Sequence, residues 1–164
     1  MSTTQVMREE FATFLKVPAG SDGTYNIMGE GITDLSISYN AKTDDVHYIH
    51  EKTARTNLTA FAPNTGDIEM EAFSGDPIFD YVDGLRKSLA TGSAVKTKAL
   101  LVNIYDKTGD TYSAQEFDAS VTVGEIGGAG GEGLKITYSV SFEGNPKAGT
   151  ATIAAGVATF TASV

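Results

Sequence analysis

Hydrophobic and polar residues alternate along much of the chain, most regularly between Leu134 and Phe142. There every second residue is apolar, and Lys, Thr or Ser lies between. A period of two is typical of a strand with one buried face. Less regular versions of the pattern predict further strands over 32–39, 67–73, 98–106, 112–123, 150–154 and 157–164, and an extended segment over 46–62. The chain is therefore expected to be mainly β.

Turn-forming residues separate these strands. Lys107-Thr108-Gly109-Asp110 predicts the turn of a hairpin, and Gly144-Asn145-Pro146 predicts another change of direction. Residues 19–31 contain four glycines and are predicted to be a loop.

One helix interrupts the strands and is predicted over about residues 77–91. Asp76 is a favourable N-cap, Pro77 suits the first helical position, and Gly92 is a plausible stop. An apolar stripe follows at helical spacing, formed by Ile78, Val82, Leu85 and Leu89. Such a helix needs a surface to cover. The expected fold is a β-sandwich or barrel of about seven or eight strands with this one helix on its flank.

At 164 residues the chain is expected to form a single domain. Residues 1–18 contain a short apolar pattern closed by Pro18, and we interpret them as an N-terminal arm that is ordered by packing on something else. Residues 40–57 are too polar for a core, so we expect a protruding hairpin or long loop there.

Charge narrows the possible partners. The formal net charge is −9, and the chain contains no run of basic residues, which argues against a surface that binds nucleic acid through its phosphates. There is no cysteine, no apolar run of signal-peptide length and no stretch long enough to span a membrane. Folding in a cytoplasm is the simplest expectation, without a membrane partner.

The sequence offers no convincing catalytic, cofactor or metal site. Residues 128–133 satisfy the pattern G-x-G-x-x-G, but they lead into a strand rather than a helix, so a flexible loop is favoured. His47 and His50 lie three apart in an extended segment, which places them on opposite faces. Residues 106–117 lack the ligands of a calcium loop at their key positions. We therefore predict a protein that is not an enzyme and needs no cofactor.

Five blocks of sequence, which span nearly the whole chain, carry a resemblance to a known family; they are residues 8–15, 28–40, 48–51, 75–83 and 159–162. In content and order these blocks resemble the tail tube (major tail) proteins of long-tailed bacteriophages, especially those of phages that infect Gram-positive bacteria.

This resemblance implies a structural subunit that forms hexameric rings, which stack into a hollow tube for DNA passage during ejection. It also implies a location in the tail of the virion, assembly in the host bacterial cytoplasm, and contacts with tape measure, tail terminator and distal tail proteins. An acidic subunit suits such a conduit, because like charges keep DNA from adhering to the wall. DNA is expected to pass without specific binding.

Two groups of residues are candidates for assembly. Those expected at ring-to-ring contacts are Phe11, Phe14, Asn40, Lys42, Asp44, Asp45, His47, His50, Glu51, Lys52 and Arg55. Those expected to line the lumen are Asp67, Glu69 and Glu71, which share one wet face of a predicted strand.

A non-catalytic ligand-binding β module, for carbohydrate or a small molecule, is the alternative. It would need a concave apolar or aromatic-lined site. Seven tyrosines and no tryptophan make a sugar-binding platform less attractive.

Overall fold

A computed structural model describes residues 2–18, 20 and 23–163 of the chain. Met1, Ala19, Ser21, Asp22 and Val164, which belong to the predicted arm, glycine-rich loop and last strand, lie outside the described residues. Within the described part the elements are the 3-10 helices η1 (Arg8–Glu10) and η2 (Gly92–Val95), the helix α1 (Pro77–Ser88), and the strands β1 (Phe11–Val17), β2 (Thr24–Ile27), β3 (Lys42–Val46), β4 (Arg55–Ala60), β5 (Ile68–Glu71), β6 (Lys96–Thr108), β7 (Thr111–Gly127), β8 (Lys135–Ala154) and β9 (Val157–Ala162).

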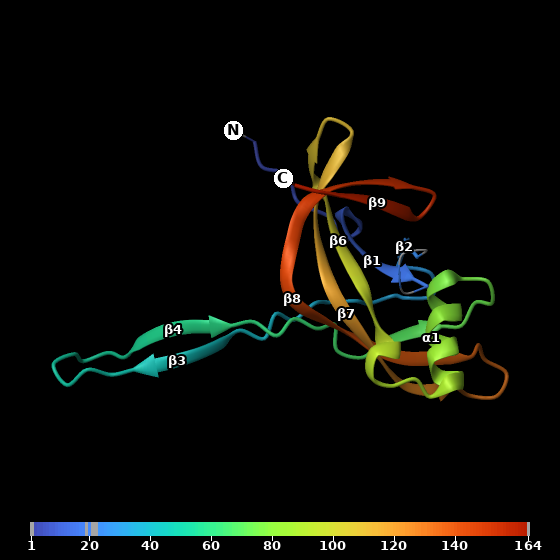
Figure 1. The fold of residues 1–164 in the computed structure, drawn as a ribbon, viewed down its shortest axis with the longest axis horizontal. Helices are drawn as coiled ribbons and strands as arrows, with labels where there is room; N and C mark the ends of the chain where they lie inside the picture. The colour runs from blue at the N-terminus through green and yellow to red at the C-terminus, as the bar shows by residue number, and fades with distance from the viewer. Residues whose placement is uncertain (1, 19, 21–22, 164) are drawn as a thin grey trace.

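Six antiparallel strands close into a barrel (Figure 1). Their order is β8-β7-β6-β1-β2-β9, and β9 returns to pair with β8. The early half of the long strand β8 also pairs with β5, which extends the sheet beyond the barrel. The prediction of a mainly β barrel with one flanking helix is confirmed.

A first apolar core fills the barrel. Every barrel strand contributes to it, through Ala12, Phe14, Tyr25, Leu100, Val102, Ala114, Ala151 and Ala158. Four of these are alanines, so the interior is narrow and Phe14, which is 0% exposed, fills much of it. Closing the barrel also removes the unpaired edges that an open sheet would expose.

A second core lies on the opposite face of the sheet, beneath α1. Leu15 of β1, Leu101 of β6 and Val140 of β8 point into it. Ile78 and Val82 of α1 cover it. Strand β1 and residues 99–102 of β6 are therefore buried on both faces, which explains why Leu100, Leu101 and Val102 form a continuous apolar run rather than an alternating one.

Helix α1 begins as predicted and ends earlier than predicted. The Asp76 carboxylate accepts a hydrogen bond from the Phe79 amide at 3.1 Å, and Pro77 occupies the first turn. The helix stops at Ser88, and Leu89 takes a left-handed conformation with φ 50°. Leu89 is therefore not part of the buried stripe, contrary to the prediction.

Three local predictions were wrong. Residues 32–39 form an extended segment, not a strand, because they meet neighbours only at isolated bridges from Ile32 and Ser38. The glycine-rich loop contains strand β2. The predicted turn at 144–146 is a bulge within β8: the pairing shifts between Asp118–Glu143 and Glu116–Lys147, and Gly144 accommodates a φ of 68°.

The predicted N-terminal arm also differs from the structure. Residues 11–17 form β1, a central barrel strand paired with both β2 and β6. The apolar residues of this segment read as a short helical pattern because both faces of β1 are buried. Of the described residues in the predicted arm, residues 2–7 and Pro18 lie outside helix and strand.

We expect Phe14→Ala to lower the free energy of unfolding by about 3–5 kcal/mol, because it leaves a cavity in the narrow barrel. Chemical denaturation measures this loss. Val6→Ala is the matched control, since Val6 is exposed and precedes the barrel, and its stability should stay near wild type. A Phe14 variant as stable as the control would show that this residue does not belong to the core.

Candidate assembly surfaces

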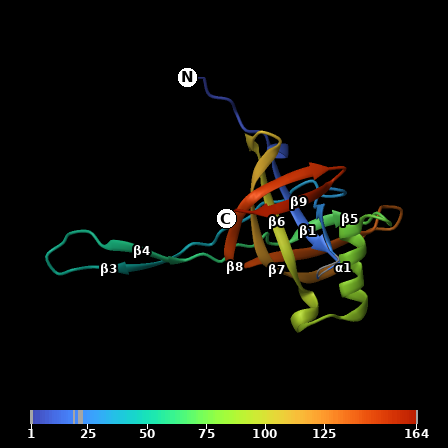
Figure 2. The same ribbon diagram turned by 45° about the horizontal axis from the view of Figure 1, so that its top comes forward.

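Strands β3 and β4 form a hairpin that stands apart from the barrel. They pair only with each other, and both views show them projecting from the side of the barrel opposite α1 (Figures 1 and 2). Every residue of β4 is exposed, as are the first four of β3. An isolated two-stranded hairpin is only marginally stable in water. This hairpin therefore presents a surface that its own chain does not cover.

Hydrogen bonds join the two arms of the hairpin at its base and connect that base to the barrel. The Ser38 and Asn64 backbones exchange hydrogen bonds at 2.8 and 2.9 Å, and the side-chain Nδ2 of Asn40 donates to the Ala62 carbonyl at 3.0 Å. On the barrel side, the Thr65 amide donates to the Val140 carbonyl of β8 at 3.0 Å. These contacts fix where the hairpin leaves the barrel.

The tip of the hairpin has an ordered arrangement of its own. The Arg55 guanidinium forms an ion pair with Glu51 and lies 5.2 Å from the centre of the Tyr48 ring. The ring of His50 stacks on Tyr48 at a centroid distance of 6.2 Å, and His47 Nε2 lies 2.6 Å from the Glu51 carbonyl oxygen. The guanidinium and ring contacts fold the tip back on itself, which leaves the side chain of Ile49 pointing away from the chain at 106% exposure.

Nine of the eleven residues predicted for ring-to-ring contacts lie in this hairpin. Asn40 is at its base, the next three are on β3, four occupy the tip, and Arg55 begins β4. The other two lie in β1: Phe14 is buried inside the barrel and is corrected to a core residue, whereas Phe11 is partly buried against the second core.

The sequence reasoning missed the apolar residues of the hairpin. Tyr39 and Phe61 face each other edge to face near the base, 6.3 Å apart, and Tyr48, Ile49 and Leu58 are exposed further out. They do not recur at any strand or helix spacing within their polar surroundings. The sequence signal that could have identified them is the presence of single apolar residues in a segment that is too polar to be core.

The three predicted lumen residues lie on a polar face of the sheet. Asp67, Glu69 and Glu71 are exposed, while Ile68 and Met70 between them are buried. The polar face continues across β8 through Thr137, Ser139 and Ser141, which are the register partners of β5 and β7 residues. Lys135 forms an ion pair with Glu69 at 3.1 Å, and this contact raises the pKa of Lys135. The face is therefore mixed in charge rather than uniformly acidic.

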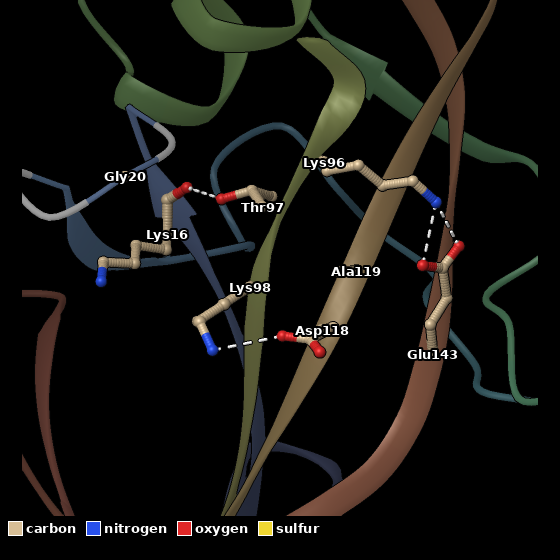
Figure 3. A pocket seen from close by; sticks show the side chains of 8 residues that line it. All are labelled: Lys16, Gly20, Lys96, Thr97, Lys98, Asp118, Ala119 and Glu143. Atoms are coloured by element: carbon tan, nitrogen blue, oxygen red, sulfur yellow. Dashed lines mark hydrogen bonds and ion pairs between the residues drawn. The ribbon is translucent and has the colours of Figure 1, made fainter. Parts of the chain in front are cut away.

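A row of charged side chains crosses four strands at the end of this face and lines a cavity of about 550 Å³ (Figure 3). Lys96 forms an ion pair with Glu143 at 2.7 Å, and Lys98 with Asp118 at 3.2 Å. Lys96 holds the pKa of Glu143 below its usual range, and Asp118 raises the pKa of Lys98. Three lysines and two carboxylates line the cavity, and none of its described lining residues is aromatic, unlike the apolar site that a ligand-binding module would need.

No group of three or more His, Asp or Glu side chains that could hold a metal ion occurs among the described residues. In the same part of the chain, no helix is long and apolar enough to cross a membrane.

No protein-family model and no curated protein matches the chain. Among solved structures, it is similar to a chain in the cryo-EM structure of the anti-feeding prophage (AFP) baseplate, 6-fold symmetrised. The match has a TM-score of 0.50 and covers 90% of this chain and 97% of that chain, at 10% sequence identity. At this identity the likeness shows a shared fold, which extends over nearly the whole of both chains.

We expect Arg55→Ala to loosen the hairpin tip while leaving the barrel intact. Arg55 joins Tyr48 to Glu51, and the Glu51 amide donates to the Tyr48 carbonyl at 3.1 Å across the same turn. Hydrogen exchange of the Glu51 amide should therefore become faster, with an unchanged melting temperature. Lys52→Ala, which removes the same charge from the same tip, should leave the exchange rate near wild type; equal rates in both variants would contradict the role of Arg55.

Proposed function

We propose that this protein is a structural, non-catalytic component of a phage-type tail, and that it builds the tail tube. The observation that carries the proposal is the β3–β4 hairpin, whose exposed apolar residues have no cover within the described chain and lie outside both cores. Surfaces of this kind mark sites of protein association. The fold shared with a chain of a six-fold prophage baseplate supports the same class of function.

In the finer form of the proposal, six copies form a ring and the rings stack through the hairpin. Asn40, the residues of β3 and the tip make the contacts between rings. Tape measure, tail terminator and distal tail proteins are the further partners, in the tail of a virion assembled in the host cytoplasm. Because no catalytic step is involved, the protein acts through its shape and surface alone.

The polar sheet face lines the bore in this proposal. Its side chains are short hydroxyls and carboxylates. Lys135 pairs with Glu69, and at the end of the face Lys96 and Lys98 pair with Glu143 and Asp118. Such a surface offers DNA neither a basic patch nor exposed aromatic rings for stacking. The polymer would therefore pass through without specific binding.

Removing the hairpin tests the proposal most simply. Replacing residues 42–60 with Asn-Gly keeps the Tyr39–Ala62 backbone contact at the base. We expect the shortened protein to retain its melting temperature within a few degrees and to form no stacked rings or tubes in negative-stain images at concentrations where the wild type does. Tubes formed by the shortened protein would contradict the assigned role of the hairpin, and a wild type that stays monomeric at every concentration would contradict the function.

Charge reversal tests the lining of the bore. We expect the triple variant Asp67→Lys, Glu69→Lys, Glu71→Lys to assemble and to retain duplex DNA inside the tube, because the added cations bind phosphates. Cryo-EM of assemblies formed with DNA measures density in the bore, which should disappear at high salt. The control variant reverses the charges of Glu9, Glu10 and Asp110 and should retain no DNA in the bore. DNA bound on the outside of the first variant's tubes would contradict the assignment of the polar face to the bore.

A further inference from the structure

Leu89 has two unfavourable features at once. It caps the C-terminal end of α1 in the left-handed region, with φ 50° and ψ 47°, where the Cβ of any residue other than glycine lies close to the following carbonyl oxygen. Its side chain is also 82% exposed, although leucine gains most when it is buried. Strained residues that persist in a fold cluster at functional sites, so Leu89 is a candidate contact residue.

Leu89 lies at a groove of about 540 Å³ between the end of α1 and the last part of β7. The apolar residues that line this groove are Leu85, Leu89, Ala90, Val95, Val121 and Val123. The ladder between β6 and β7 stops at Lys96–Ser120, so the edge of β7 beyond Ser120 has no β6 partner. Arg86, Thr91 and Thr122 also line the groove, so it is mainly apolar and can receive an apolar side chain.

The hairpin carries an exposed apolar side chain, Ile49, that could occupy such a groove. Ile49, at 106%, and Leu89, at 82%, have the highest exposures among the large hydrophobic residues of the described chain; Phe61 follows at 57%. The hairpin and α1 lie on opposite sides of the barrel (Figures 1 and 2), so the two residues cannot cover each other within one copy. When a second copy lies beside the first in the same orientation, the hairpin tip of one copy points toward the groove of the other.

The distribution of charge does not oppose this pairing between copies. Residues 40–62 hold three of the 12 Lys and Arg residues and three of the 21 Asp and Glu residues, so the hairpin is neutral and the rest of the chain carries the whole net charge of −9. Like-charged barrels repel one another, whereas a neutral hairpin approaches an acidic barrel without that cost.

We propose that the hairpin tip of one copy inserts Ile49 into the groove beside Leu89 of a second copy. This inference rests on the proposed function and identifies the receiving surface for the hairpin. The two surfaces differ, so the contact is head-to-tail, and repetition extends an assembly in one direction. A closed pair of copies would instead need a self-complementary surface.

Cysteine cross-linking tests the contact directly, because the chain has no native cysteine. The double variant Ile49→Cys, Leu89→Cys should give a ladder of disulfide-linked oligomers on non-reducing gels after mild oxidation of the assembled protein. Either single variant should give at most a small amount of dimer. A double variant with Ile49→Cys and Leu134→Cys is the matched control, because Leu134 is an exposed leucine outside the groove, and it should give no ladder.

A second variant separates docking from folding. Leu89→Asn introduces a residue that tolerates the left-handed region, so the melting temperature of the monomer should stay level or rise. The concentration needed for half-maximal assembly should increase about tenfold, since a buried apolar contact is lost. Leu134→Asn should leave assembly unchanged.

The outcomes distinguish this inference from the function on which it rests. Wild-type tubes without a ladder from the Ile49–Leu89 pair, or with unchanged assembly of Leu89→Asn, overturn the docking contact and leave the tube proposal in place. A ladder together with weakened assembly supports both. A wild type that never assembles overturns both.

Discussion

The fold combines a barrel that buries its apolar residues within its own chain with a hairpin whose apolar residues remain exposed. The barrel closes its sheet and has an apolar core on each side of it, so it is stabilised by contacts within its own chain. The β3–β4 hairpin has its own ladder, and its strand residues are exposed or only partly buried among the described residues. Hydrophobic burial is the main favourable term in folding and in association, so the hairpin gains from contact with another molecule what the barrel gains from its own chain.

The barrel provides a rigid base for such contacts. Strand β1 and residues 99–102 of β6 are buried on both faces, and α1 covers the second core. The hairpin leaves this base through the paired backbones of Ser38 and Asn64 and the contact of Thr65 with β8. A projection fixed at its base loses less freedom on binding than a free loop would, and preorganisation of this kind strengthens association.

The clearest elements of the fold were predictable from local chemistry. The alternation around Tyr138 predicted the strand, and Asp76 with Pro77 predicted the start of α1. The failures share one cause, since they depended on distant parts of the chain. Phe14 appeared to belong to an arm because burial on both faces removes the period of two, and Gly144 appeared to mark a turn because a bulge uses the same backbone freedom as a turn.

The candidate surface was predictable in outline and not in its key residues. The polarity of residues 40–57 showed that this segment lies outside the core. The sequence did not indicate that Ile49 and Leu89 are exposed. A single isoleucine in a polar segment shows no periodicity, and Leu89 fits the apolar stripe of the predicted helix. Their exposure follows from where α1 ends and how the tip folds on Arg55, and both are tertiary features.

Hydrogen exchange along β3 and β4, compared between the monomer and the assembled protein, tests the central claim most directly. We predict rapid exchange of these amides in the monomer and strong protection in the assembly, with the barrel amides protected in both. A hairpin that is fully protected in the monomer, or that exchanges equally fast after assembly, would contradict the claim that its partner is another copy of the chain.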